Sequence, residues 1–269
     1  MITTFGDALL DVIVRLDEPL AAGADALAAT QTSVGGQAAN VAAWAVALGA
    51  EARCVAKRGD DLAGKLVYVE LEARGVEPAG PVQGRSGIVV SLVGTDGERT
   101  MASDRGAGPE LSADELDPEW FACDCLHISG YALFSRPIDG AALRAAELAR
   151  KRGARVSVDL SAWTRIREYG PVRFRELLER LAPDVIFANE AEWEIVGAAY
   201  GLAPTAVVKR GARGVLVLGE EGVELPAAAV DVVDATGAGD ALAAGFLVGG
   251  PELAVEAAAL CVGKLGAMP

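Results

Sequence analysis

The sequence predicts one α/β domain with a central, mainly parallel β-sheet flanked by helices. Strand-like apolar runs alternate with helical patterns along most of the 269 residues. No repeat of fixed period and no low-complexity linker divides the chain. The composition, with 52% hydrophobic and 23% charged residues, is ordinary for a globular protein of this length. We therefore predict a single domain over residues 1–269.

The predicted elements follow one another in a regular order. Apolar or β-branched runs predict strands at residues 1–6, 51–57, 125–130, 155–160 and 184–189. Helical spacing of apolar residues predicts helices at 37–49, 61–75, 140–153 and 174–182, and the first three end at a glycine. Strands that alternate with helices in this way form parallel sheets, and ligands bind at the C-terminal ends of such strands.

Two regions, residues 11–34 and 86–104, break this alternation. Both contain short strand-like runs joined by turns, and the stretch 95–98 (TDGE) is suited to a hairpin tip. We interpret them as a small β-sheet that forms a lid over the ligand site. A decorated edge of the main sheet is the alternative. The strand edges near residues 11–16 and 86–102 would need partners, which predicts a homodimer formed through the lid.

Charge and composition exclude several classes of function. The net charge of −14 argues against nucleic acid or an anionic membrane as the main partner. No apolar run has the length of a membrane span, and the N-terminus lacks the basic start of a signal peptide. The four cysteines (Cys54, Cys123, Cys125 and Cys261) have neither redox nor zinc spacing, so we expect reduced thiols in a cytoplasmic protein. The only histidine, His127, lies in a strand-like run and is interpreted as structural, which disfavours a Ser-His-Asp hydrolase.

Residues 59–66 (GDDLAGKL) resemble a phosphate-binding P-loop, but the match is incomplete. Leu66 stands where the Ser or Thr that holds magnesium is required, and Gly64 and Lys65 fall inside a predicted helix. No GxGxxG pattern follows the first strand either. We therefore reject a Walker motif and an NAD-dependent oxidoreductase.

The stretch 232–246 (VVDATGAGDALAAGF) places two glycines and Asp240 directly before an apolar helix. Asp240 suits the first turn of a helix for structural reasons alone. Glycines at a helix N-terminus also form a cradle for anions, where a carboxylate can accept a proton. Both interpretations fit this stretch by itself.

Polar residues occur near three other predicted strand ends. Gly35 and Gly36 allow a ligand to approach the backbone, and Asn40 offers a donor and an acceptor to hydroxyls; a glycine turn before a helix is the alternative. Asn189 and Glu192 share one face of a helical turn and could order magnesium-bound water, or could form a simple polar helix start. Residues 207–217 predict a strand, a glycine turn and a second strand, which would line a nucleotide or form a plain hairpin.

Together these motifs resemble the PfkB/ribokinase family of carbohydrate kinases over nearly the whole chain. The matching segments, in order, are the first strand with Asp11, GGQAAN (35–40), GDDLAG (59–64), the Asn189/Glu192 pair, VKRGARG (208–214) and DATGAGD (234–240). The last is close to the signature of the family, and the others gain weight from their order. The resemblance implies a ribokinase-like fold and transfer of the γ-phosphoryl group of ATP to a hydroxyl, usually a primary alcohol.

The resemblance also implies roles for individual residues. Asp240 would be the catalytic base, and the N–H groups of Gly237, Ala238 and Gly239 would form the anion hole. The nucleotide side would consist of Asn189, Glu192, Lys209, Gly211, Gly214 and Thr236, with Mg²⁺ held through water by Asn189 and Glu192. The acceptor side would consist of Asp11, Gly35, Gly36, Asn40 and Arg105. Asp234 and Thr236 match part of a monovalent cation site in the family, and the brief C-terminal segment leaves activation by K⁺ open.

The acceptor stays open between several small molecules. Keto-deoxy-sugar-acid kinases tend to carry Asp-x-Asn-x-Arg where this chain has Asp159 followed by Leu-Ser-Ala-Trp, so a sugar acid is disfavoured. A sugar or sugar derivative is the favoured acceptor. The alternatives are a nucleoside kinase, which the aromatic content of 5% disfavours, and a sugar-binding regulator without catalysis, which would not need Asp240.

Overall fold

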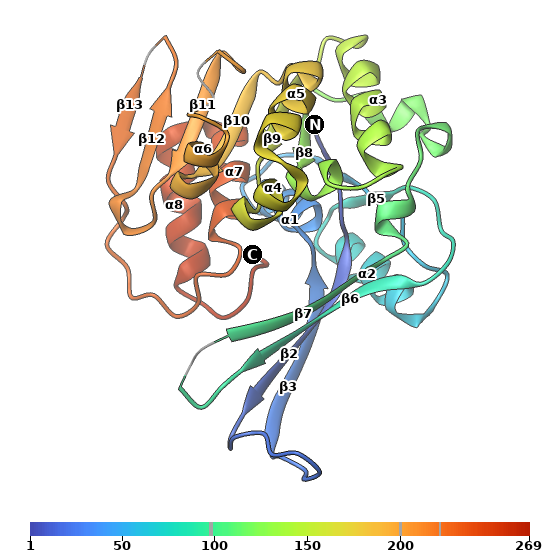
Figure 1. Ribbon diagram of the computed structural model, residues 1–269, viewed down its shortest axis with the longest axis vertical. Coiled ribbons are helices and arrows are strands. Elements are labelled where there is room, and N and C mark those ends of the chain that lie inside the picture. The colour runs from blue at the N-terminus through green and yellow to red at the C-terminus, as the bar shows by residue number, and fades with distance from the viewer. Residues whose placement is uncertain (97–98, 199–200, 221) are drawn as a thin grey trace.

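A nine-stranded sheet forms the centre of the computed structural model, which describes residues 1–96, 99–198, 201–220 and 222–269 (Figure 1). In spatial order its strands are β13 (Val223–Leu225), β12 (Val215–Leu218), β11 (Thr205–Lys209), β10 (Val185–Asn189), β9 (Arg155–Asp159), β8 (Cys125–Ser129), β1 (Ile2–Phe5), β4 (Ala52–Val55) and β5 (Glu77–Ala79). All neighbours from β5 to β11 are parallel, whereas β12 and β13 are antiparallel additions at one edge. The predicted, mainly parallel sheet is confirmed.

Helices cover both faces of this sheet. The α-helices are α1 (Gln37–Ala47), α2 (Leu62–Ala73), α3 (Ile138–Arg150), α4 (Trp163–Tyr169), α5 (Pro171–Leu181), α6 (Glu190–Ile195), α7 (Ala238–Gly249) and α8 (Pro251–Val262). Short 3₁₀ turns are η1 (Gly108–Glu110), η2 (Ala113–Glu115), η3 (Pro118–Phe121), η4 (Gly130–Leu133) and η5 (Gly211–Arg213). None of the helices in the described ranges is long and apolar enough to span a membrane.

The two faces have separate hydrophobic cores, because successive strand residues point in opposite directions. In β10, Ile186 packs into the core under α3 to α6, whereas Phe187 packs into the core under α1, α2, α7 and α8. The strand is buried along most of its length, as expected for the middle of a parallel sheet. Charged side chains of this sheet therefore gather at the ends of its central strands, as Asp159 and Lys209 do.

Two helices lie outside the elements that the sequence predicts. Helix α4 has seven residues and buries only Ile166, so it has no apolar period to detect. Helix α8 is rich in alanine on most sides and lacks a clear polar face. Gly64 and Lys65 lie inside α2, which confirms the rejection of the P-loop.

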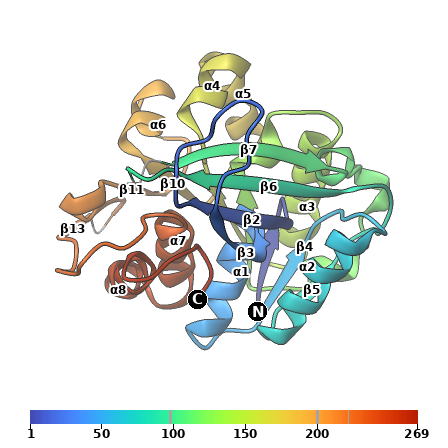
Figure 2. The ribbon, with the colours of Figure 1, turned by 90° about the horizontal axis from the view of Figure 1, so that it is seen from below.

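The smaller sheet contains β3 (Ala28–Gly35), β2 (Leu9–Leu16), β6 (Ser86–Val93) and β7 (Arg99–Gly106), in that order. It extends away from the main sheet and lies across its lower end in Figures 1 and 2. Strand β2 pairs with β3 and β6, and β6 pairs with β2 and β7, so the expected exposed edges at residues 11–16 and at the β6 part of residues 86–102 are wrong. The edges are β3 and β7, because side-chain alternation does not tell which strands of a sheet are central. Part of the predicted hairpin tip, Gly97 and Glu98, lies outside the described residues.

Asp61 joins helix α2 to the smaller sheet. Its Oδ1 accepts a hydrogen bond from the Gly64 N–H (2.9 Å) and thereby caps the helix. Its Oδ2 accepts a second bond from the Ser86 N–H, at the first residue of β6 (2.9 Å). One carboxylate therefore satisfies backbone donors of two elements.

We predict that Asp61→Ala lowers the free energy of unfolding by about 1–2 kcal/mol, because a helix cap and a strand contact are lost together. Asp60→Ala is the matched control, since Asp60 is exposed and adjacent in sequence. The measurement is chemical denaturation of both variants beside the wild type. Equal stability of the two variants would contradict the prediction.

Candidate functional site

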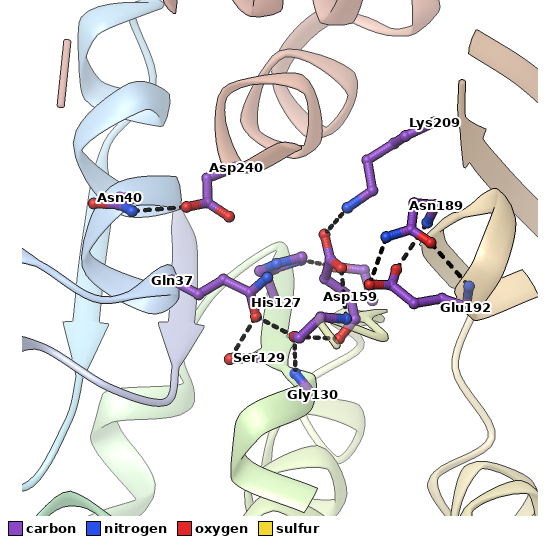
Figure 3. A network of polar contacts seen from close by, with 12 residues as sticks. Gln37, Asn40, His127, Ser129, Gly130, Asp159, Asn189, Glu192, Lys209 and Asp240 are labelled. Atoms are coloured by element: carbon purple, nitrogen blue, oxygen red, sulfur yellow. Dashed lines mark hydrogen bonds and ion pairs between the residues drawn. The ribbon is translucent and has the colours of Figure 1, made fainter. Parts of the chain in front are cut away.

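Asp240 lies in the first turn of α7 and faces the N-terminal part of α1 (Figure 3). Its Oδ2 accepts a hydrogen bond from Asn40 Nδ2 at 2.7 Å. Burial raises the pKa of Asp240 to about 7, with a further rise from Asp159; the Asn40 hydrogen bond, Lys209 and Gln37 oppose this rise. A carboxylate with a pKa near neutrality is suited to accept a proton and to release it again.

An ion pair joins the ends of two strands beside Asp240. Lys209 Nζ at the end of β11 lies 2.6 Å from Asp159 Oδ2 at the end of β9. The Asp159 side chain is 1% exposed and that of Lys209 is 15% exposed. Burial lowers the pKa of Lys209, but the carboxylates of Asp159 and Glu192 outweigh burial and raise it, so the ammonium stays charged.

The Lys209 ammonium also lies against the start of α7. A Cβ atom placed on Gly239 would be 3.2 Å from Lys209 Nζ, so the absence of a side chain at this position lets the cation approach the helix. The charged amine and the positive end of the α7 dipole therefore meet at one place. An anion that approached this place would be attracted by both.

Asn189 and Glu192 form a reciprocal cap at the start of α6. The Glu192 N–H donates to Asn189 Oδ1 and the Asn189 N–H donates to Glu192 Oε2, both at 2.8 Å. Asn189 Nδ2 donates to Glu192 Oε1, also at 2.8 Å. Glu192 is 2% exposed, and burial followed by the charge of Asp159 raises its pKa. The pair is thus a polar helix start that also brings a carboxylate close to Lys209.

The glycine turn before α7 leaves backbone donors free. Gly237 has φ +79°, and a Cβ there would come within 2.5 Å of the Ala267 Cβ, so this position requires glycine. No described residue accepts a hydrogen bond from the N–H of Gly237 or Gly239, whereas the Ala238 N–H donates to the Ala235 carbonyl at 3.3 Å. Two of the three predicted anion-hole donors are therefore unused within the described protein.

The loop before this turn is fastened to the C-terminal segment. Asp234 Oδ1 accepts hydrogen bonds from the N–H and the hydroxyl of Thr236 (2.9 and 2.6 Å). Asp234 Oδ2 accepts one from the Gly266 N–H at 3.0 Å, and Trp44 Nε1 of α1 donates to the Ala267 carbonyl at 2.8 Å. The predicted cation-site residues are thus engaged in holding the loop.

The predicted acceptor residues gather at the base of the smaller sheet. The Asp11 carboxylate of β2 lies against Gly35 of β3, where a Cβ would come within 2.1 Å of it. Gly36 caps α1 with φ +95°, a conformation that favours glycine. Asn40 Oδ1 is buried and has no hydrogen-bond partner among the described residues, so it can accept a bond from a ligand hydroxyl.

Arg105, the remaining predicted acceptor residue, is held by a partner that the sequence analysis missed. Its Nε and Nη2 donate to the two oxygens of Asp7, at 2.8 and 3.1 Å. Asp7 is 5% exposed and directly follows Gly6 after the first strand. The Arg105 guanidinium also lies 5.9 Å from the centre of the Tyr131 ring. An acidic residue at the end of a buried strand was the signal that could have indicated Asp7.

Gln37, which the sequence analysis also missed, lies between Asp240 and the ends of β8 and β9 (Figure 3). Its Oε1 accepts hydrogen bonds from the hydroxyls of Ser129 and Ser161. Ser161 has φ +72°, and its Oγ accepts a hydrogen bond from the Gly130 N–H at 3.0 Å. The amide oxygen is thus committed to the serines, so the amide NH₂ group is the end available to Asp240.

The predicted nucleotide residues of the β11–β12 turn follow Lys209 directly. Gly211 has φ +56° with no atom within 4 Å of a Cβ built on it, so its outer side is open. Gly214 has φ +84°, and a Cβ there would meet the Leu225 carbonyl oxygen at 2.0 Å. Gly211 therefore borders open space, whereas Gly214 serves the tight turn.

His127 lies behind the site and is fully buried. Its Nδ1 is 2.9 Å from the Ser157 hydroxyl, and burial lowers its pKa to about 4, so the ring is neutral near pH 7. The four cysteines are free thiols, and burial raises the pKa of each of them. No group of three or more His, Cys, Asp or Glu side chains in the described part of the chain could hold a metal ion by itself.

Comparison with known proteins identifies the fold. Adenosine kinase from Sinorhizobium meliloti superposes with a TM-score of 0.86 at 26% identity, covering 100% of this chain and 95% of that one. Arabidopsis thaliana ribokinase, solved with ribose and ATP, gives a TM-score of 0.80 at 25% identity and covers 100% and 95%. The fold is therefore ribokinase-like, and the site lies at the strand ends of a small-molecule kinase.

Sequence comparison identifies the family. The pattern of the pfkB family of carbohydrate kinases matches residues 1–269. An ATP-dependent ribose-1-phosphate kinase from Halopiger xanaduensis is 34% identical over 270 residues, covering 93% of this chain and 86% of that protein. The chain belongs to the pfkB family of carbohydrate kinases and is an ATP-dependent kinase of that class.

The raised pKa of Asp240 leads to a prediction about stability. The unfolded value is 3.8 and the folded value about 7, so folding favours the protonated acid, and stability is lost as the pH rises from 4 to 7. Asp240→Asn should therefore be more stable than the wild type at pH 8 by about 2 kcal/mol, after allowance for partial exposure to solvent, and equal to it near pH 4.

Urea denaturation of both proteins at pH 4, 6 and 8, without ligands, measures this difference. Asp231→Asn, at an exposed position in the preceding loop, is the control and should follow the wild type. A stability difference that does not grow with pH would show that the folded protein does not favour the protonated Asp240.

Proposed function

We propose that this protein transfers the γ-phosphoryl group of ATP to a primary alcohol of a sugar or sugar derivative. The observation that carries the proposal is the position of Asp240, with a pKa of about 7, beside the free N–H groups of the α7 turn. A proton acceptor and a set of anion donors within one helical turn are what an in-line attack by a hydroxyl on a phosphoryl group requires.

Each part of the site has a distinct task in this reaction. Asp240 accepts the proton of the acceptor hydroxyl. The oxygen of that hydroxyl bonds to the γ-phosphorus of ATP, and the bond from this phosphorus to ADP breaks. The N–H groups of Gly237 and Gly239 and the Lys209 ammonium stabilise the charge on the phosphoryl oxygens. Asn40 donates to Asp240 through Nδ2 and offers its unpaired Oδ1 to the acceptor.

The acceptor is oriented by the base of the smaller sheet. Asp11 and Arg105 come from β2 and β7, and the turn at Gly35 and Gly36 leads directly into α1. Closure of this sheet over the acceptor would exclude water, which otherwise competes as the nucleophile. The lid role of residues 11–34 and 86–104 is part of the proposal.

Bound MgATP supplies the phosphoryl group and neutralises part of its negative charge. The residues present fit such a ligand, because Gly211 borders open space and the carboxylates of Asp159, Glu192 and Asp240 lie around a single described lysine, Lys209. Since no cluster of described side chains forms a metal cage, Asn189 and Glu192 are proposed to act on Mg²⁺ through water.

We also propose that a monovalent cation binds beside Asp234 and Thr236. The proposal does not distinguish K⁺ from Na⁺. The Asp234 carboxylate already organises the loop and the C-terminal segment through three hydrogen bonds. A cation bound there would act by stiffening the turn that carries the anion donors.

Similar proteins act on both free and substituted sugars, which supports a sugar-like acceptor. A protein 34% identical to this chain is named for ribose-1-phosphate, a solved relative contains ribose, and another is an adenosine kinase. A nucleoside is therefore the second candidate acceptor. ADP release measured with magnesium, ATP and a panel of sugars, sugar phosphates and nucleosides separates the two.

We predict that Asp240→Asn lowers kcat by at least ~100-fold while the Kd for ATP changes little, as expected for loss of a general base. In the wild type, activity should rise with pH to a plateau above about pH 7, because only the ionised Asp240 accepts a proton. Steady-state kinetics and ATP titration calorimetry give the two quantities. Asp231→Asn is the control, and near-normal turnover in Asp240→Asn would remove Asp240 from the mechanism.

We also predict a homodimer through the smaller sheet, because β3 and β7 are its edge strands and no described strand pairs with their outer sides. Light scattering at micromolar concentration should give twice the mass of 27.6 kDa. A proline at Thr30 in β3 would remove a backbone donor at the edge and should weaken the dimer. A monomeric wild type would contradict the prediction.

A further inference from the structure

A cavity of about 350 Å³ lies among the segments that follow β8 and β9, and the proposed reaction does not use it. Its lining comes from the segment between η4 and α3 with the first turn of α3, from α4 and from the first turn of α5. The first two segments follow β8 and β9, whose ends hold Ser129 and Asp159 of the network. The cavity therefore opens at the ligand-binding edge of the sheet and has the size of a small-molecule pocket.

Arginine dominates the lining of this cavity. Arg136, Arg165 and Arg173 face it together with two acids, Asp139 and Glu168. Arg165 pairs with Glu168 at 2.9 Å, and Arg136 lies 3.9 Å from Asp139. Arg173 stacks over the Tyr169 ring at 4.3 Å, and no described carboxylate forms an ion pair with it.

The lining of the cavity carries an excess of positive charge, whereas the whole chain carries an excess of negative charge. The lining holds three arginines and two acids, although the whole protein has 24 basic and 38 acidic residues. A local positive pocket in an acidic protein concentrates anions at one place. Guanidinium groups in particular match the geometry of phosphate oxygens.

A buried hydroxyl in the lining lacks a hydrogen-bond partner. Ser135 contributes to the wall of the cavity, and its Oγ is inaccessible and unpaired among the described residues. Leaving such a hydroxyl unsatisfied costs free energy, so a native structure usually supplies a partner. A turn of the Ser135 side chain about its Cα–Cβ bond would let an anionic oxygen in the cavity accept this hydrogen bond.

Tyr131 connects the cavity to the acceptor side of the site. Its ring centre lies 6.2 Å from that of Phe134, which lines the cavity, and 5.9 Å from the Arg105 guanidinium. Burial raises the pKa of Tyr131, and the charges of Glu192, Arg165, Asp240 and Arg105 all act on it. One side chain is therefore close both to the catalytic carboxylate and to an arginine of the cavity.

We propose that this cavity binds a phosphate group of the acceptor through Arg165, Arg173 and the Ser135 hydroxyl, so that the acceptor is a phosphorylated sugar with a free hydroxyl for Asp240. The proposal rests on the proposed kinase function and names its substrate class. The phosphate anchors one end of the sugar, which leaves the other end to reach the catalytic base.

The test compares free sugars with their phosphate monoesters in the ADP-release assay, for the wild type, Arg165→Gln and Arg173→Gln. We expect monoesters to be the better acceptors, and each variant to raise the KM for the monoester roughly tenfold or more with kcat and the KM for ATP little changed. Arg165 is 61% exposed, so its replacement should not unfold the protein. Arg167→Gln on the same helix is the matched control, because Arg167 stacks on Trp163 and does not line the cavity.

Inorganic phosphate is the second probe, and it should inhibit in competition with the monoester. Inhibition that is not competitive would indicate a separate regulatory anion site and overturn the proposal. Equal use of free sugars and monoesters, with unchanged KM in Arg165→Gln and Arg173→Gln, would overturn it while leaving the kinase function intact. Absence of ADP release with every acceptor would instead refute the kinase function on which the proposal rests.

Discussion

The ion pair between Asp159 and Lys209 is the interaction around which the site is organised. It joins the ends of β9 and β11, on either side of β10, and both side chains are largely removed from water. A buried pair of this kind is stable only while both partners remain, because a single buried charge is costly. Lys209 reaches the start of α7 because position 239 is glycine. The ion pair therefore fixes where the ammonium of the sheet lies relative to the N–H groups at the start of the helix.

Burial, together with an excess of negative over positive charge, explains the raised pKa values of the carboxyl groups near this pair. Asp240 and Glu192 both have raised pKa values, with burial as the main cause and Asp159 as an additional one. One lysine cannot neutralise three carboxylates. This excess of negative charge is electrostatically unfavourable, and such arrangements are common at functional sites, where side chains are placed for function rather than for stability.

The sequence predicted the fold well because each layer has its own periodic signal. Strands such as β8, β9 and β10 are continuous apolar runs, and α2 and α3 carry an amphipathic pattern, so the alternation of a parallel sheet was visible. The order of strands within the smaller sheet was not, since β2 reads equally well as an edge or a central strand. Short helices such as α4 escaped prediction because they bury too few residues to show a period.

The candidate site could be predicted only as far as local motifs extend. Asp240 and the glycine turn occupy one contiguous stretch, and Asn40 belongs to another. The roles of Asp7 and Gln37 depend on partners about 90 to 200 residues away, namely Arg105, Ser129 and Asp240. A single sequence contains no signal for such pairs, because they are created by the packing of helix α1 and strand β7 against the sheet.

The fastening of the C-terminal segment has a consequence for how this protein could be handled and altered. Gly266 and Ala267 hold the loop with Asp234 and the indole of Trp44, and the Pro269 carbonyl accepts a hydrogen bond from Arg74 of the segment after α2. The C-terminal segment therefore holds α1 and the loop before α7 together. Proteolytic removal of this segment, or its displacement by a bulky fusion, would leave the glycine turn before α7 less firmly held. No residue that we expect to contact a substrate would be changed.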